Sequence, residues 1–280
     1  MLRALGLVTV LGFVPSSAEA WCQLTSENVE VRPGECVTEG APLRWERRCL
    51  SYTLDTSGSP DLPIETVRAV VQDAFAEWTS VDCDGSPLDF EVQETEVLAE
   101  CRRAEHRSGG PNLNAITFLD EWPSRYPEEA YAVTSVWHRV DDGEILDADI
   151  VVNNRLGPYA ICPDDGCEEG PDGVVPADLP NVLTHEVGHF FGLAHSQFGW
   201  AAMGASSPRG ETRKRTVWSD DAVGICAIYP PGSLDTACDF TPLGGQGTTC
   251  PKSGCSATGA RPGLFAALLA LLAVGWRRRR

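Results

Sequence analysis

Basic residues are scarce in this chain relative to acidic ones. It has 22 lysines and arginines against 40 aspartates and glutamates, and a formal net charge of −18. Residues 1–20 are neutral and residues 256–280 carry five arginines, so residues 21–255 carry −23. Binding to a phosphate backbone needs a basic face, so this composition argues against nucleic acid as a partner and favours solubility.

Long apolar runs are also missing. The run near the C-terminus, Leu264–Trp276, has thirteen residues. As a helix it would span about 20 Å at ~1.5 Å per residue, against a hydrocarbon core of about 30 Å. A permanent membrane span is therefore not expected.

The first twenty residues are typical of a secretory signal peptide. Arg3 precedes an apolar run from Ala4 to Val14, and small residues stand at Ala18 and Ala20. This order predicts export and cleavage after Ala20. We expect the mature protein to be secreted or to lie at a cell surface, as a monomer.

The C-terminal tail, residues 255–280, combines Cys255, the apolar run and four closing arginines. This order resembles the tripartite sorting tails of myxobacterial surface proteins, which contact the membrane and are processed at or near the cysteine. Arginines held on the cytoplasmic side fit that orientation. The alternative is an amphipathic or frayed terminus.

Eleven cysteines in an exported chain predict disulfides. If Cys255 belongs to the tail, ten cysteines remain for five bridges. The sequence leaves their pairing open, although Cys162 and Cys167 flank a short stretch and could close a local loop. We expect Cys36 to belong to a disulfide.

Apolar periodicity predicts an α+β domain with about three helices. Residues 64–78 place apolar side chains on one helical stripe, and further helices are expected over 178–192 and from Ser219, as N-cap, to Pro230. In the third helix Val223, Cys226 and Ala227 would share a face. Strands are expected at 49–55 (half-buried), 87–93, 115–120, 132–140 and 145–154, with a hairpin turn at 141–143.

Histidine is rare, yet three of the five histidines lie in the stretch LTHEVGHFFGLAHS, residues 183–196. His185 and His189 are one helical turn apart and can bind one metal ion. Gly192 can take the positive φ that ends the helix and returns His195 as a third ligand. Three imidazoles leave a tetrahedral zinc one open position, which is typical of a catalytic site.

Glu186 lies beside this ligand set without being part of it. It could take a proton from a zinc-activated water that attacks a carbonyl, and pass it to the leaving amine. The pattern therefore predicts hydrolysis of peptide bonds without a covalent intermediate. The sole methionine after the leader, Met203, follows His195 by eight residues and suggests a tight turn beneath the metal.

The stretches HEVGHFFGLAHS, AAMGA and SDDAVGICAIYP resemble the matrixin branch of metzincin zinc endopeptidases, and the likeness extends over about residues 43–230. It implies a twisted mixed sheet whose antiparallel edge strand, expected at Ile145–Asn153, pairs with an extended polypeptide substrate. It also implies that His185, His189 and His195 bind zinc, that Glu186 is the base and that Met203 is structural.

The chain departs from that family in two respects. No cysteine-switch prodomain is recognisable, and His138 lacks the partners of a structural zinc site. His138 and His106 are therefore expected to be ordinary surface or strand residues. A calcium site would draw on the acidic loop that contains Asp164, Asp165, Glu168, Glu169 and Asp172, for which a solvated loop is the alternative.

These features predict an ordered set of segments. A signal peptide (1–20) precedes a Cys/Pro-rich segment (21–42), a matrixin-like catalytic domain (43–232), a Gly/Thr/Pro-rich linker (233–254) and the sorting tail (255–280). The predicted function is a zinc metalloendopeptidase. The alternatives are a surface adhesion module that keeps zinc as a staple, for which Glu186 has no use, and a zinc hydrolase of other amides.

Overall fold

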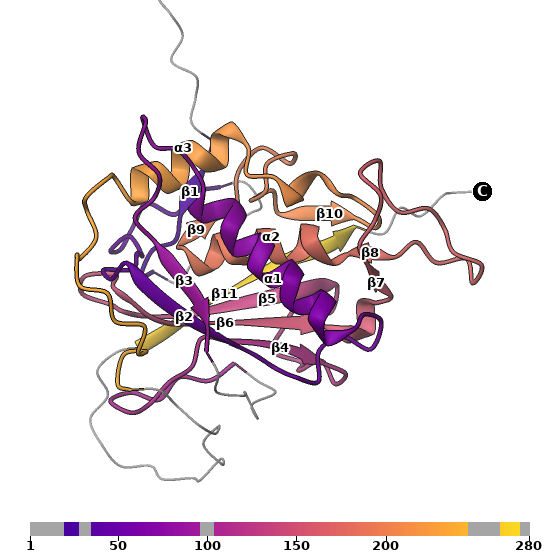
Figure 1. Cartoon of the computed structure of the whole chain (residues 1–280), viewed down its shortest axis with the longest axis horizontal. Coiled ribbons are helices and arrows are strands. Elements are labelled where there is room, and N and C mark those ends of the chain that lie inside the picture. The colour runs from indigo at the N-terminus through magenta and orange to yellow at the C-terminus, as the bar shows by residue number, and fades with distance from the viewer. Residues whose placement is uncertain (1–19, 28–34, 96–103, 246–263, 275–280) are drawn as a thin grey trace, which may run out of the picture.

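The computed structural model describes residues 20–27, 35–95, 104–245 and 264–274. Their largest unit is a mixed sheet with strand order β10-β11-β5-β6-β4-β2-β3 (Figure 1). β6, β4, β2 and β3 run parallel, whereas β5 is antiparallel to β6 and β11 is antiparallel to β5. The strand bounds are β2 Cys49–Leu54, β3 Glu91–Glu94, β4 Ala115–Leu119, β5 Ala130–Arg139, β6 Ile145–Asn153, β10 Ser206–Pro208 and β11 Leu264–Val274.

Three α-helices cover one face of this sheet or its end, in the part of the chain that the structure describes. They are α1 Ile64–Thr79, α2 Leu179–Phe190 and α3 Ser219–Ile228. The predicted apolar stripe of α1 is confirmed: its buried residues are Val67, Val70, Val71, Ala74, Phe75 and Trp78. Figure 1 shows α1 and α2 in front of the sheet. This α+β arrangement of three helices and a mixed sheet agrees with the predicted fold class.

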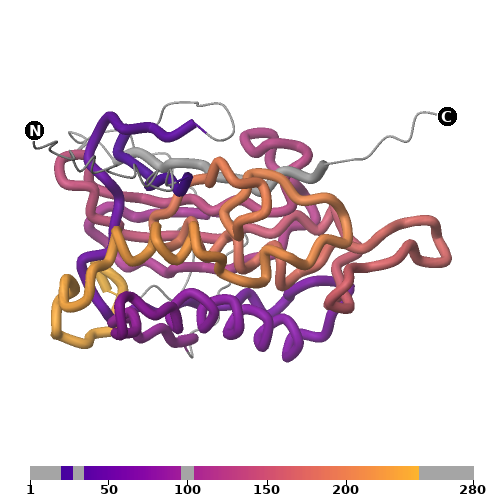
Figure 2. The backbone as a smooth tube through the Cα atoms, turned by 90° about the horizontal axis from the view of Figure 1, so that it is seen from above, coloured from indigo at the N-terminus to yellow at the C-terminus, as the bar shows by residue number. Residues whose placement is uncertain are grey.

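Short elements complete the chain. β1 (Cys22–Gln23) pairs with β9 (Leu193–Ala194), and β7 (Tyr159–Ala160) pairs with β8 (Ala177–Asp178). Two 3₁₀ turns, η1 and η2, cover Asn154–Leu156 and Arg213–Arg215. The acidic loop between β7 and β8 projects from the body of the domain in Figures 1 and 2. Among the described residues no helix is both long and apolar enough to cross a membrane.

The predicted position of the edge strand at Ile145–Asn153 is wrong. This segment is β6, which lies inside the sheet between β5 and β4. All but one of its residues are buried, because the helices cover one face and the segment around residues 104–114 packs on the other. Within the predicted catalytic domain the antiparallel strand next to β6 is β5, so β5 takes the place that the sequence assigned to β6.

Two further expectations fail for α3. Its N-cap is Trp218, not Ser219, and the Asp221 carboxylate accepts a hydrogen bond from the Trp218 backbone N–H. Val223 is 46 % exposed, so the predicted face is not the buried one. The absence of a side chain at Gly224 lets the Trp21 ring pack against the helix, and the buried residues of α3 are Asp220, Asp221, Gly224, Ile225 and Ile228.

The strands agree with prediction in place and less in burial. β2 is buried along its whole length rather than half-buried, because both of its faces are covered, and β3 begins at Glu91 rather than near residue 87.

The disulfides of the described residues are Cys22–Cys36, Cys49–Cys238, Cys83–Cys226 and Cys162–Cys167. The predicted bridges of Cys36 and of Cys162 with Cys167 are thus confirmed. Cys101, Cys250 and Cys255 lie outside the described residues.

Candidate metal centre

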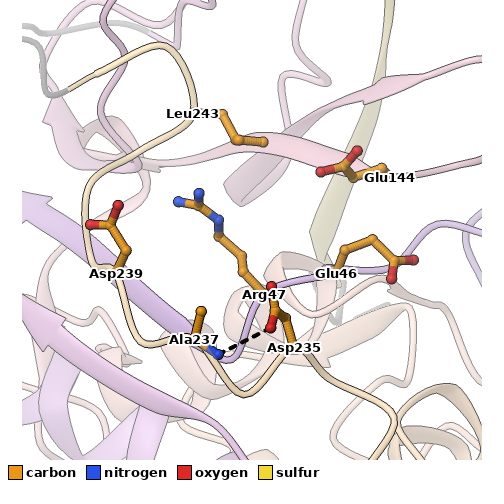
Figure 3. Close-up of a pocket in the computed structure, with 7 residues that line it drawn as sticks. All are labelled: Glu46, Arg47, Glu144, Asp235, Ala237, Asp239 and Leu243. Carbon is orange, nitrogen blue, oxygen red and sulfur yellow. Dashed lines mark hydrogen bonds between the residues drawn. The ribbon is translucent and has the colours of Figure 1, made fainter.

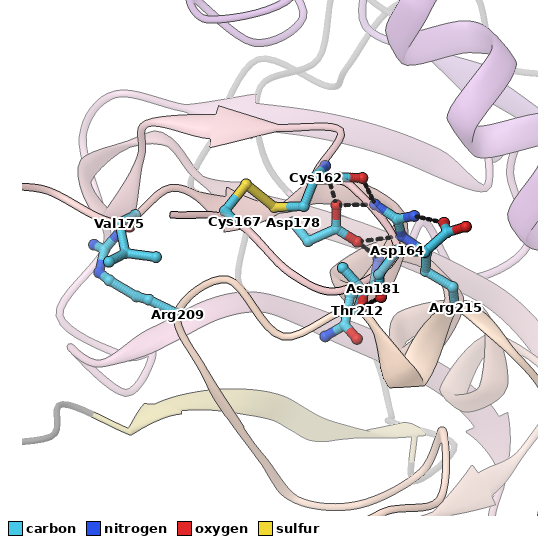
Figure 4. Close-up of a disulfide and its surroundings, with 9 residues drawn as sticks. All are labelled: Cys162, Asp164, Cys167, Val175, Asp178, Asn181, Arg209, Thr212 and Arg215. Atoms are coloured by element: carbon cyan, nitrogen blue, oxygen red, sulfur yellow. Dashed lines mark hydrogen bonds and ion pairs between the residues drawn. A yellow bond between two sulfur atoms is a disulfide. The ribbon is translucent and has the colours of Figure 1, made fainter. Parts of the chain in front are cut away.

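The start of α2 is fixed by a buried polar contact. Asp178 caps the helix by accepting the Asn181 backbone N–H, and Pro180 occupies the first turn. The same carboxylate accepts from the Arg215 guanidinium at 2.6 Å and from the backbone N–H of Cys162 (Figure 4). These bonds tie the disulfide loop, η2 and the helix together, so the axis of α2 has a defined direction.

Three histidine rings meet beyond the last turns of this helix. His185 and His189 lie on α2, and His195 follows β9. The Nδ1 atom of His185 is 2.6 Å from the Ala202 carbonyl oxygen, and that of His189 is 2.8 Å from the Leu193 carbonyl oxygen. A carbonyl only accepts, so Nδ1 carries the hydrogen and Nε2 presents a lone pair on both rings.

The Nε2 atoms of the three rings fit a metal ion. One ligand atom of each ring lies within 4.8 Å of the others. All three Nε2 atoms are buried without a hydrogen-bond partner among the described residues. A buried polar atom without a partner is costly, and a metal ion satisfies it. The nitrogen-only donor set and the one-turn spacing suit zinc.

The environment keeps these rings neutral, as metal ligands must be. Burial, together with the neighbouring imidazoles, lowers the pKa of His185 and His189 well below the ordinary value. Burial also lowers the pKa of His195 to about 4. At neutral pH protons therefore do not compete with a metal for the three nitrogens.

Two glycines allow the close packing around the rings. Gly192 has φ +90° where the chain leaves α2, and a Cβ there would lie 2.6 Å from the Leu43 carbonyl oxygen. Gly188, between the two helical histidines, lies against Met203, and a Cβ on it would fall 2.1 Å from the Met203 sulfur. Met203 is completely buried, in the turn expected from its spacing.

Glu186 lies on α2 next to His185 and has no exposed surface. The Thr134 hydroxyl of β5 donates to its carboxylate Oε2 at 2.6 Å and lies 3.1 Å from its backbone carbonyl oxygen. The carboxylate is thus tied to the strand that runs beside the metal centre. Sequence reasoning missed Thr134, because no local pattern distinguishes a strand threonine that reaches a helix 52 residues away.

The paired aspartates of α3 hold the two loops that follow α2. Asp221 accepts the backbone N–H groups of Ala202 and Met203 at 2.8 and 3.0 Å. Asp220 accepts the Ser196 hydroxyl at 2.6 Å and the Ala20 N–H at 3.0 Å. Both aspartates belong to the stretch that carries the family resemblance, but the sequence alone did not indicate which groups they would bind.

A buried lysine supports the same region. The Lys214 ammonium donates to the carbonyl oxygens of Gly199 and Ala201, and its side chain has no exposed surface. Burial lowers the pKa of Lys214. It crosslinks η2 to the loop after His195, and a lone lysine in a basic stretch gave no signal of this role.

The remaining candidate clusters do not form metal sites. Cys49, Glu91 and Cys238 lie close together, but the two cysteines are joined in a disulfide.

A cavity of about 490 Å³ is lined by Arg47 among carboxylates and lies at the end of the domain near the segment after α3 (Figure 3). Its lining residues are Glu46, Arg47, Glu144, Asp235, Ala237, Asp239 and Leu243.

His138 is buried and the His106 side chain is only 6 % exposed, contrary to the surface part of their prediction. His138 on β5 is 1 % exposed. The His106 ring lies 3.2 Å from Asp147, in a contact between the segment before β4 and the outer face of β6. In the acidic loop, Asp164 is near Arg215. The described residues give no calcium cluster there.

Comparison with known families agrees with this geometry. Residues 138–230 match the Matrixin family. The matched segment runs from the end of β5 to the residue after Tyr229, so it contains α2, the three histidines, Met203 and α3.

The matrixin match is accompanied by similarity to curated metalloproteinases. The chain is 28 % identical over 195 residues to Metalloendoproteinase 1-MMP of Arabidopsis thaliana, covering 67 % of this chain and 45 % of the relative. It is 28 % identical to the Interstitial collagenase of Equus caballus (70 % and 34 %) and to Matrix metalloproteinase-19 of Homo sapiens (66 % and 30 %). The chain therefore spans less than half the length of these relatives, and it is matrixin-like in the part that it shares with them.

Proposed function

We propose that residues 43–232 form a zinc-dependent endopeptidase that hydrolyses peptide bonds of extended polypeptides. The main support is the site itself. Three imidazole nitrogens without hydrogen-bond partners lie close together, and the Glu186 carboxylate lies beside them without being needed as a ligand. A zinc staple in an adhesion module explains the histidines and leaves Glu186 unexplained. The relatives' names also refer to endoproteinases or collagenase.

In this mechanism His185, His189 and His195 hold the metal through Nε2. Bound zinc would supply a Lewis acid that polarises the scissile carbonyl and lowers the pKa of a water towards neutrality. Glu186 accepts the proton of the attacking water and returns it to the leaving nitrogen. Thr134 orients this carboxylate by donating to Oε2.

The substrate would pair with β5, because an extended chain can add to a free strand edge through backbone hydrogen bonds. We define the β5 edge as the side of Ala130–Arg139 that faces away from β6. Thr134 lies on this strand and touches Glu186, so a chain bound along the β5 edge passes the metal centre. The Asp221 bonds to Ala202 and Met203 keep the turn beneath the rings in place.

We further propose that the protein is exported as a monomer and acts outside the cell or at its surface. The leader over residues 1–20 and the four disulfides among the described residues are the support. The tail over 255–280 would contact the membrane during export and be processed near Cys255. Of the predicted linker over 233–254, residues 235–240 lie along β2 and Cys238 is bonded to Cys49, so this part belongs with the catalytic domain.

The test is cleavage of a chemically unfolded protein by residues 21–254, produced under oxidising conditions. We expect cleavage, its loss after incubation with a chelator, and its return when one equivalent of zinc is added. Bound metal is quantified at each step. Cleavage that persists in the metal-free protein would contradict the proposal, and so would a stoichiometric zinc complex that cuts no unfolded polypeptide.

A further inference from the structure

The β5 edge is paired with a segment from the far end of the chain. β11 runs antiparallel along it, from Leu264 opposite Arg139 to Leu272 opposite Ala130. The last residues of β11 pair in parallel with β10, from Leu272 opposite Ser206 to Val274 opposite Pro208. β11 therefore lies between β5 and the segment that follows the Met203 turn (Figure 1).

The register brings β11 past the metal centre. Leu269 pairs with Thr134, the residue whose hydroxyl holds the Glu186 carboxylate. β11 also contacts α2, which carries Glu186 and two of the histidines. His185, His189 and Glu186 have no solvent-exposed surface in this arrangement. His195 is partly exposed, so what β11 occupies is the strand position beside Glu186 rather than every face of the centre.

The backbone groups on the β5 edge can pair with one strand at a time. An extended substrate and β11 need the same groups, so they exclude each other. We propose that residues 264–274 are an intramolecular occupant of the substrate position, which keeps the enzyme inactive until the tail is removed. The pairing of β11 with β5 stands on the structure alone, whereas the inhibition that follows from it rests on the proposed peptidase function.

The sequence of this segment suits the role. LFAALLALLAV contains no charge, proline or glycine, so nothing in it opposes pairing with an exposed strand. Being covalently linked, it acts at an effective concentration of the order of millimolar, whereas substrates typically have KM values from about 1 μM to 1 mM. If the tail binds the β5 edge as strongly as a substrate does, the ratio of this effective concentration to KM, about 1 to 10³, is the factor by which the paired form is favoured. Processing near Cys255 would remove β11 and open the β5 edge.

The first test measures hydrogen exchange of the β5 amides and needs no activity. The exported chain through Arg280 carries Glu186→Ala and a cleavage site for a sequence-specific protease after Gly254. A chain without that site, treated identically, is the control. We expect cutting to speed the exchange of amides on the β5 edge at least tenfold and to leave α1 unchanged. Equal exchange before and after cutting would overturn the proposal.

A cut segment that stays bound would mask this effect, so a second variant is included. Adjacent residues of a strand point their N–H groups to opposite sides, and one of Ala267 and Leu268 therefore faces β5. Ala267→Pro with Leu268→Pro removes that donor and breaks the strand. The same rise in β5 exchange is expected without any cutting, and unchanged β5 protection in this variant also counts against the proposal.

The second test measures activity with Glu186 intact, on an unfolded protein substrate. The proline variant and the cut chain should both have a kcat/KM at least tenfold above that of the intact chain. Equal rates in all three would overturn the inhibition. If no form cuts although β5 exchange depends on the tail, the pairing stands and the peptidase function fails, which separates the two proposals.

Discussion

Asp147 is a buried carboxylate that lowers the free energy of unfolding when it is ionised, so its effect on stability depends on pH. It has no exposed surface, and its Oδ2 lies 3.2 Å from His106, while Oδ1 has no partner among the described residues. Burial raises the pKa of Asp147 well above the usual range. Burial and the charge of Asp147 do the same for the pKa of Asp149. Between the ordinary aspartate pKa and these raised values, the folded protein therefore keeps protons on both carboxyl groups that the unfolded chain has released.

From this we predict how Asp147→Asn changes stability. As pH rises above the ordinary aspartate pKa, the folded protein must ionise a buried group, and the free energy of unfolding falls. The variant has no such group, so at pH 8 it should be more stable than the parent. Near pH 4 the difference should shrink. Denaturant unfolding at both pH values checks this, and a loss of stability at pH 8 would contradict it.

At the level of single residues, the sequence could predict the chemistry of His185, His189, His195 and Glu186 because fixed spacing on one helix suffices to place them. It could not predict Thr134 or the His106–Asp147 contact. Both join residues more than 40 positions apart in the chain, and their partners follow only from the pairing of strands.

Helix α2 carries the site and is packed without spare room. The Cβ built on Gly188 meets the Met203 sulfur at 2.1 Å and the Trp78 ring at 2.6 Å, and both side chains are buried. Trp78 is itself held by donating to the Thr184 carbonyl oxygen. α1, α2 and the Met203 turn therefore fix one another.

We predict that Gly188→Ala destabilises the domain and weakens zinc binding. Overpacking costs about 1–3 kcal/mol, and the better helix propensity of alanine returns at most ~1 kcal/mol. A net loss of about 1–2 kcal/mol is expected in thermal or denaturant unfolding, with a higher dissociation constant for zinc. Gly199→Ala is the matched control, since nothing lies within 4 Å of a Cβ there. A neutral Gly188→Ala would show that α2 can move away from the turn.

The elements of this fold were predictable to different degrees. The apolar stripe of α1 and the start of α2 near Asp178 follow from local patterns and lie where expected, and α2 ends at Phe190, two residues before the predicted Gly192. The exposed face of α3 and the interior place of β6 do not, because each depends on a distant neighbour, Trp21 or β4. Alternation along Ile145–Asn153 cannot distinguish an edge strand from one buried on both faces.

Across the whole molecule, disulfides tie the sheet to distant segments. Cys49 in β2 is joined to Cys238 after α3, over a separation of 189 residues, whereas Cys162 and Cys167 are five apart. The sequence left the long pairing open, since cysteine spacing does not define connectivity. The structure also orders residues 235–240 along β2, where Ser51 donates to the Phe240 carbonyl oxygen.

Removing these two bridges should have unequal effects. Because Cys83–Cys226 shortens the loop that Cys49–Cys238 closes, the chain-entropy estimate gives about 4 kcal/mol for Cys49→Ala with Cys238→Ala and about 2 kcal/mol for Cys162→Ala with Cys167→Ala. Unfolding of each double variant under oxidising conditions measures the difference. Equal losses would mean that the long bridge joins parts already held together in the unfolded chain.

The central claim is that Glu186 acts in catalysis beside zinc without binding it. The most direct measurement compares residues 21–254 with and without Glu186→Gln, recording bound zinc and the rate of polypeptide cleavage on the same samples. We predict one zinc per chain in both, and a rate lower by about 10²–10⁴ in the variant, the usual contribution of a general base. Loss of zinc from the variant, or an unchanged rate, would contradict the account.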